Sequence, residues 1–135
     1  MNKNKPQAKE WLKAAKDDLD SISYLINAPH LSNIVAFHAQ QAIEKSLKAI
    51  IEYYQLSLIK THNLEKLYKH IQEQIDFEID YDMLEVINEL YIEARYPGEF
   101  GLLPSGKPSL KEAYEFFDFA KEVFAKVCSI LNIKL

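Results

Sequence analysis

The chain contains a single arginine, Arg95, which lies near the start of its one segment rich in glycine and proline. That segment, "IEARYPGEFGLLPSGKPS" (residues 92–109), holds all 3 glycines of the chain. A guanidinium is a planar donor fork that suits a phosphate, a carboxylate or an aromatic face, and the ammonium of a lysine does not match this geometry. Alternatively, Arg95 complements the C-terminal dipole of a helix, worth roughly 0.3–1 kcal/mol, which a lysine would do nearly as well. Both interpretations stay open, and the first predicts an anion-binding residue.

The far end of the same segment, "GLLPSGKP" (residues 101–108), nearly matches the phosphate-binding G-x-x-x-x-G-K-[ST] loop. We reject this match because that loop follows a strand, whereas a helix is expected here. In addition, Pro108 replaces the hydroxyl residue that binds magnesium. The segment is therefore predicted to be a connection built from turn residues. A weaker interpretation remains, since Lys107 lies beside the start of the next predicted helix, whose free amides can attract an anion.

A row of polar side chains follows one side of the second predicted helix. At 100° per residue, the row consists of His38, Gln41, Lys45, Lys48 and Glu52. Such a row is ordinarily the solvent-facing side of an amphipathic helix. Its terminal histidine and its continuity also suit a face that meets a partner subunit or a phosphate-bearing ligand.

Gln40 falls within the apolar sector of the same helix, between Ala36 and Leu47. A buried amide without partners costs ~1–3 kcal/mol, so this side chain must find hydrogen bonds. We expect a structural bond to a loop, either to the "THNL" turn at residues 61–64 or to the segment after Arg95.

Metal binding and nucleophilic catalysis find little support in the sequence. His38 and His62 lack the spacing of two metal ligands on one helix, and the lysines on the face of His38 disfavour a cation there. No Ser-His-Asp or Cys-His arrangement stands out, so we predict no metal and no cofactor. The single cysteine, Cys128, has apolar neighbours and is expected to be a small buried side chain. It cannot support a disulfide framework within the chain, which fits a reducing compartment.

The elements that position these residues are predicted to be helices, because glycine is rare and apolar residues recur every three or four positions. We expect long helices at residues 8–27 and 31–55, a short helix after "KTHNL", a fourth from about residue 82 to Pro97 and a last one from residue 109. Expected caps are Thr61 or Asn63, Asp82 with Glu85, and Ser109 with Glu112. The buried face of the last helix is predicted to comprise Leu110, Ala113, Phe117, Ala120, Phe124, Val127 and Leu131. The pattern predicts an all-α fold, an antiparallel up-and-down four-helix bundle with an additional short helix, forming one domain over residues 1–135.

Composition limits the classes of function. The net charge of −4 gives no global basic surface for nucleic acid, so any phosphate binding must rely on a local patch. The polar N-terminus and the lack of an apolar run near ~18 residues predict neither a signal peptide nor a membrane span. We expect a cytoplasmic protein.

Four strings along the chain resemble those of the HEPN family, small helical domains of prokaryotes and of some larger eukaryotic proteins. They are "WLKAAKDDLDSISYLI", "FHAQQAIEKSLKAII" (residues 37–51), "THNLEKL" and "ARYPG". The resemblance covers nearly the whole chain. It implies an up-and-down helical bundle that commonly dimerises.

The resemblance implies two kinds of activity. Many members are metal-independent endoribonucleases, often toxins or defence proteins, in which an arginine is followed four to six residues later by a histidine. Here Arg95 is followed by "YPGEFGL", so the general acid or base of that motif is missing. Only His38 or His62 could replace it. Other members resemble the substrate-binding domain of aminoglycoside nucleotidyltransferases and pair with a separate minimal nucleotidyltransferase, and the "RYPG" form is similar to this branch.

We therefore predict a non-catalytic HEPN module that binds a nucleotide or another phosphate-bearing ligand, as a homodimer beside a nucleotidyltransferase, in a toxin–antitoxin or defence-like context. The predicted roles are phosphate binding by Arg95, positive charge from Lys45 and Lys48, base stacking by Tyr96, further contacts from His38, Gln41 and Glu44, and loop support from Gln40 and His62. One alternative is a metal-independent endoribonuclease toxin that uses Arg95 with His38 or His62. The other is a pure protein-interaction module.

Overall fold

The computed structural model of the protein describes residues 4–95 and 107–135, with side chains described for all of these except residues 92–95. The elements are α1 (Lys5–Leu25), η1 (Pro29–Leu31), α2 (Ser32–Tyr53), α3 (Leu64–Gln72), α4 (Tyr81–Arg95) and α5 (Leu110–Leu131). The described ranges contain no strand. The predicted all-α helical bundle is therefore confirmed.

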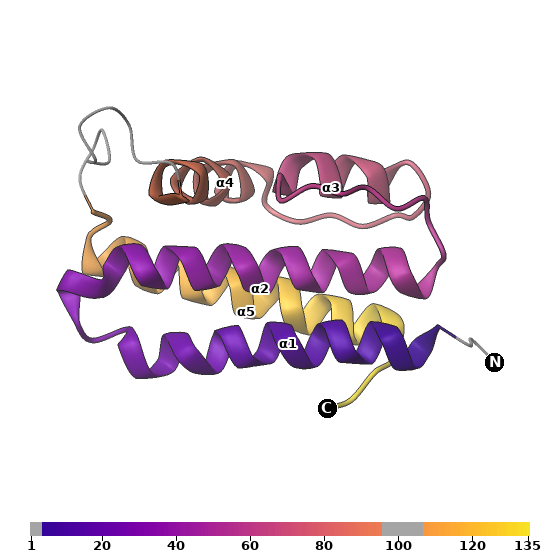
Figure 1. The fold of residues 1–135 in the computed structure, drawn as a ribbon, viewed down its shortest axis with the longest axis horizontal. Coiled ribbons are helices and arrows are strands. Elements are labelled where there is room, and N and C mark those ends of the chain that lie inside the picture. The colour runs from indigo at the N-terminus through magenta and orange to yellow at the C-terminus, as the bar shows by residue number, and fades with distance from the viewer. Residues whose placement is uncertain (1–3, 96–106) are drawn as a thin grey trace.

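Helix α2 is the central element of the bundle. Figure 1 shows α1, α2 and α5 side by side along the long axis, with α3 and α4 lying end to end along the other side of α2. The short helix α3 and the 15-residue α4 thus share one side of the bundle. A side chain on α2 can reach α1 on one flank and the α3–α4 layer on the other.

Alanines let neighbouring helices approach α2 closely. Ala39, Ala42 and Ala49 are fully buried, together with Ile43 and Leu47. Small side chains at helix contacts shorten the distance between helix axes. Tyr54, which directly follows the last residue of α2, is 41% exposed.

Two of the predicted helix caps are confirmed and one is wrong. The side chain of Asn63 accepts a hydrogen bond from the Lys66 amide at the start of α3, and Ser109 with Glu112 forms a capping box at the start of α5. At α4, however, Asp80 Oδ1 accepts from the Met83 amide at 3.2 Å. Helix α4 begins before the predicted cap, and Asp82 lies in its first turn.

The buried face of α5 differs from the predicted one. Leu110 is exposed, and Phe117 and Phe124 are only partly buried. The residues buried instead are Phe116, Phe119 and Val123, alongside the expected Ala113, Ala120, Val127 and Leu131. Adjacent apolar residues let the periodicity fit either stripe. Packing of α5 against both α1 and α2 selects the observed one.

Within the described residues, none of the helices combines the length and the apolar character needed to cross a membrane.

Candidate functional site

The polar row of α2 does not simply face solvent, because two buried acids bind three of its members, namely His38, Lys45 and Lys48. We name two groups of side chains. The Asp18 cluster consists of Asp18, His38 and Lys45, and the Glu44 cluster consists of Glu44, Gln40, Lys48 and His62.

In the Asp18 cluster, one carboxylate from α1 binds two side chains of α2. Asp18 Oδ1 lies 2.8 Å from His38 Nδ1, and Asp18 Oδ2 accepts from Lys45 Nζ at 2.7 Å. The Asp18 side chain is only 9% exposed, whereas those of His38 and Lys45 are each 25% exposed. His38 and Lys45 are seven residues apart, two helical turns, so they lie on the same face of α2 and reach the same acid. The cluster therefore links α1 to α2 through polar side-chain contacts.

In the Glu44 cluster, a more deeply buried carboxylate has three partners. Glu44 Oε2 accepts from Lys48 Nζ at 2.8 Å, Oε1 accepts from Gln40 Nε2 at 3.1 Å, and His62 Nδ1 lies 3.0 Å from Oε1 and 3.1 Å from Oε2. The Glu44 side chain is 4% exposed. A buried charge is tolerated when it is paired and its remaining lone pairs are hydrogen-bonded, as they are here.

Gln40 connects this cluster to the loop between α2 and α3. It is fully buried, and its Nε2 also donates to the backbone oxygen of His62 at 2.9 Å. Its side-chain oxygen accepts from Gln41 Nε2 at 2.6 Å. The "THNL" turn, one of the two loops that the sequence suggested as partners, is thus a partner of Gln40, and the segment after Arg95 lies outside the described residues. The amide thereby fixes the backbone that carries the His62 ring.

The two clusters share one arrangement: a carboxylate between the Nδ1 of a histidine and the Nζ of a lysine. Because an ionised carboxylate only accepts hydrogen bonds, Nδ1 of each histidine must carry a proton. In a neutral imidazole the Nε2 atom is then left as an acceptor, and the orientation of each ring is fixed. In each cluster a buried carboxylate thus holds the histidine ring in one orientation.

The lysines of these clusters are not free cations. The two carboxylates and two ammonium groups cancel in formal charge, leaving the pair of clusters neutral while His38 and His62 are neutral. Any attraction for an anion must therefore come from protonated histidines or from further cations such as Arg95.

Aromatic rings connect the end of α4 to both histidines. The Tyr91 ring packs edge-to-face against Phe37, with 5.8 Å between centroids, and lies 6.2 Å from the ring of His62. Phe37 in turn lies 5.3 Å from the ring of His38. Arg95 is the last residue of α4, four residues beyond Tyr91 and hence about 6 Å further along the helix axis. The end of α4 therefore comes close to both clusters.

A family model for the HEPN domain matches residues 8–131 of the chain. The chain belongs to the HEPN domain family. Its helical bundle agrees with this assignment, which the strings quoted from the sequence had suggested.

Solved structures of two other proteins resemble this HEPN domain. TT1696 from Thermus thermophilus is 27% identical in sequence, with a TM-score of 0.71 over 94% of this chain and 97% of that one. ST0689, an archaeal HEPN homologue, is 20% identical, with a TM-score of 0.68 over 92% of this chain and 97% of that one. At that identity the second likeness shows the fold alone. None of the curated proteins compared with the chain gives a significant match.

The structure places five of the predicted ligand-binding residues on α2, with His38 and Lys45 in the Asp18 cluster, Glu44 and Lys48 in the Glu44 cluster, and Gln41 bound to Gln40. The side chain of Arg95 and the whole of Tyr96 lie outside the described residues, so their roles remain predictions. Glu44 is too deeply buried for easy contact with a ligand, and it fits better as the group that positions Lys48 and His62.

Sequence reasoning missed Asp18, which anchors His38 and Lys45. The signal was present in α1, since Asp18 lies three residues after Ala15 and four before Ile22, both fully buried. An acid at an inward position of an apolar stripe must find a partner. No three side chains of His, Cys, Asp or Glu in the described part of the chain group as a metal site would require.

Proposed function

We propose that this HEPN module binds a nucleotide or another phosphate-bearing ligand at the surface formed by α2, the His62 loop and the end of α4. The observation that carries the proposal is the pair of ring contacts of Tyr91. One contact is to Phe37, the neighbour of His38, and the other is to His62. These contacts bring the helix that ends in Arg95 against His62 and against Phe37, whose ring in turn contacts that of His38. The guanidinium can then supply the positive charge that the two neutral clusters lack.

The buried acids orient the ligand-binding groups rather than touch the ligand. Asp18 and Glu44 hold His38 and His62 through Nδ1, so each Nε2 is available to a phosphate oxygen when the ring is protonated. Lys45 and Lys48 offer their remaining N–H groups from the same helix face. In this proposal the module is non-catalytic, because the histidines donate to the phosphate and do not act as a general acid or base.

The resemblance to nucleotidyltransferase-associated members extends the proposal to partners. The module acts as a homodimer beside a minimal nucleotidyltransferase, in a toxin–antitoxin or defence-like context. Sedimentation equilibrium of the purified protein tests the first part, and a molar mass that stays at the monomer value of 15.7 kDa at all concentrations would contradict it.

Isothermal titration calorimetry with ATP and AMP tests the binding proposal. The wild-type protein is expected to bind, and Arg95→Ala is expected to bind at least about tenfold more weakly, because a charge-assisted pair is lost. Arg95→Lys keeps the charge but not the planar fork and should fall between the two. Equal heats from all three proteins would exclude a binding role for Arg95.

A second function, a metal-independent endoribonuclease, is favoured by one specific observation. Each histidine has its Nδ1 held by a buried carboxylate, which is how a general base is oriented in many active sites. If this function holds, RNA is cleaved in the presence of EDTA, and His38→Ala or His62→Ala removes the cleavage. RNA that stays intact at high protein concentration would exclude it.

A further inference from the structure

A hollow lies beside Lys48, the partner of Glu44. It has a volume of about 100 Å³ and is lined by Trp11, Lys48, Ile51, Glu52, Leu58, Ile59 and Lys60. A wider and more open hollow of about 350 Å³ adjoins it, with Trp11 and Glu52 common to both. Residues of α1, α2 and the loop between α2 and α3 thus form the walls of the smaller hollow.

We propose that this hollow is the base-binding subsite of the module, and that it takes the planar ring of a nucleotide by stacking on Trp11. This inference rests on the proposed function and adds a specific location to it. It gives Trp11 the stacking role that the sequence had suggested for Tyr96.

The walls of the hollow have the chemistry that a nucleobase requires. Trp11 is partly buried and supplies a large aromatic surface, and Ile51 adds an apolar wall. Leu58 stands on the loop with 72% of its surface exposed, so its apolar side chain is accessible to a ligand in the hollow. Glu52 contributes a carboxylate, which can accept a hydrogen bond from the exocyclic amino group of a base.

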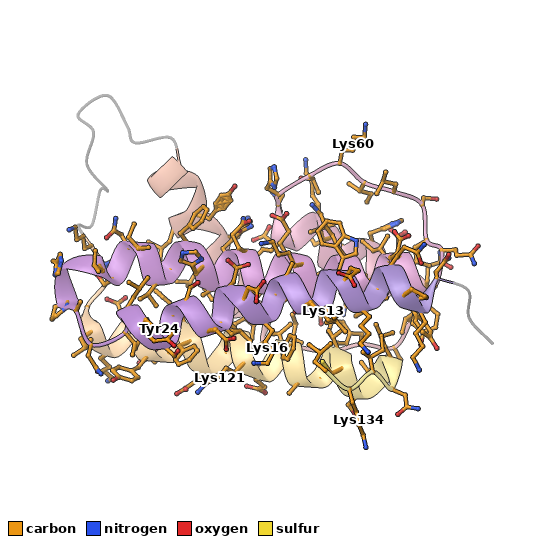
Figure 2. All side chains as sticks on the ribbon, turned by 60° about the horizontal axis from the view of Figure 1, so that its bottom comes forward. Lys13, Lys16, Tyr24, Lys60, Lys121 and Lys134 are labelled. Carbon is orange, nitrogen blue, oxygen red and sulfur yellow. The ribbon has the colours of Figure 1, made fainter. Side chains whose placement is uncertain are left out.

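The positive charges lie where the rest of a nucleotide would extend. Lys48 Nζ lies over the Trp11 ring, 5.5 Å from its centroid, and also binds Glu44, so this member of the Glu44 cluster also lines the hollow. Lys60 lies on the loop two residues before His62, and Figure 2 shows its side chain extending outward from that loop. A base in the hollow therefore places its sugar and phosphate near His62 and the two lysines.

The size of the hollow favours a single ring system. Sites for whole small molecules usually measure about 300–1,000 Å³, so 100 Å³ is enough for only part of a nucleotide. Stacking on an aromatic side chain tolerates any base, because every base has a π face. The subsite is thus expected to discriminate little between bases.

Trp11 is the only tryptophan of the chain, so its fluorescence reports directly on the hollow. AMP, adenosine and ribose 5-phosphate are the probes for the intact protein. We expect AMP and adenosine to change the fluorescence in a saturable way and ribose 5-phosphate to leave it unchanged. Calorimetry on the same samples measures binding whether or not the fluorescence responds.

Three variants separate stacking from general effects on folding. Trp11→Leu keeps an apolar side chain and should weaken AMP binding by about 5- to 100-fold, whereas Trp11→Phe should lose much less. Leu58→Glu changes a side chain that is mostly exposed, so the fold is unaffected, and it should weaken AMP binding about fivefold or more through repulsion of the phosphate. The matched control is Tyr24→Leu, which removes another aromatic side chain of α1, 89% exposed and near its opposite end (Figure 2).

The outcomes distinguish the subsite from the proposed function. One outcome would overturn the subsite and leave the ligand-binding function in place. In it, calorimetry shows that AMP binds without a fluorescence change, and that wild type, Trp11→Leu and Leu58→Glu bind it with equal affinity. Absence of binding by both AMP and ribose 5-phosphate would overturn both. Two results together support the proposal. AMP changes the fluorescence in a saturable way, and Trp11→Leu and Leu58→Glu bind AMP more weakly whereas Tyr24→Leu does not.

Discussion

At the scale of single residues, the candidate site depends on two buried acids that serve as anchors. Asp18 and Glu44 each join a histidine to a lysine, and both are nearly inaccessible. The polar row of α2 was predictable from its spacing, and so was the need of Gln40 for a partner. The choice between the two loops suggested for Gln40 was not, because the THNL turn is 22 residues away in the chain and only the folded backbone places it beside the amide.

The role of Asp18 can be tested against a neighbouring acid. Asp18→Asn removes the charge that holds Lys45 and is expected to lower the free energy of unfolding by about 1–3 kcal/mol. The matched control is Asp20→Asn, because Asp20 pairs with Lys16 at the surface, where a pair contributes about 0–1 kcal/mol. Urea denaturation measures both, and equal losses would contradict the anchoring role.

The thiol of Cys128 is expected to react slowly. Burial raises the pKa of Cys128, so less thiolate is present at a given pH than in a free cysteine. The rate of alkylation by iodoacetamide should therefore rise only at more alkaline pH, and unfolding in urea should accelerate it at a fixed, mildly alkaline pH. A folded-state rate equal to that of the unfolded chain would contradict this account.

At the scale of elements, the existence of each helix was predictable from the spacing of its apolar residues. The residues at which a helix begins and ends, and the face that it buries, were less predictable. The caps at Asn63 and Ser109 were found because each of these polar residues stands directly before an apolar repeat. At α4 two acids compete, Asp80 and Asp82, and local spacing favoured the wrong one. On α5 adjacent phenylalanines fit two stripes, and only contacts with α1 and α2 decide between them.

The cap of α4 provides the test at this scale. Asp80→Ala removes the hydrogen bond to the Met83 amide and should cost about 1 kcal/mol of stability. Asp82→Ala removes only a charge in the first turn and should cost less, about 0.3–0.5 kcal/mol. Thermal unfolding compares the two, and a larger loss for Asp82→Ala would mean that the helix begins later than described.

At the scale of the whole molecule, the site exists because α2 is central. It has α1 on one flank and the α3–α4 layer on the other (Figure 1). Groups from residues 18, 38, 44, 62 and 91 therefore meet around one helix. Membership of the HEPN family was visible in short strings of sequence. The pairing of two histidines with two buried acids was not, since each pair joins residues about twenty positions apart.

The central claim is that a phosphate-bearing ligand binds at His38 and His62, and side-chain NMR of protein labelled with ¹⁵N-histidine tests it most directly. On addition of ATP we predict shifts of the Nε2 signals of His38 and His62, while His30, in the η1 turn, stays unchanged as an internal control. Arg95→Ala should require about tenfold more ATP for the same shifts. Unchanged His38 and His62 signals under conditions where ATP is shown to bind by calorimetry would contradict the account.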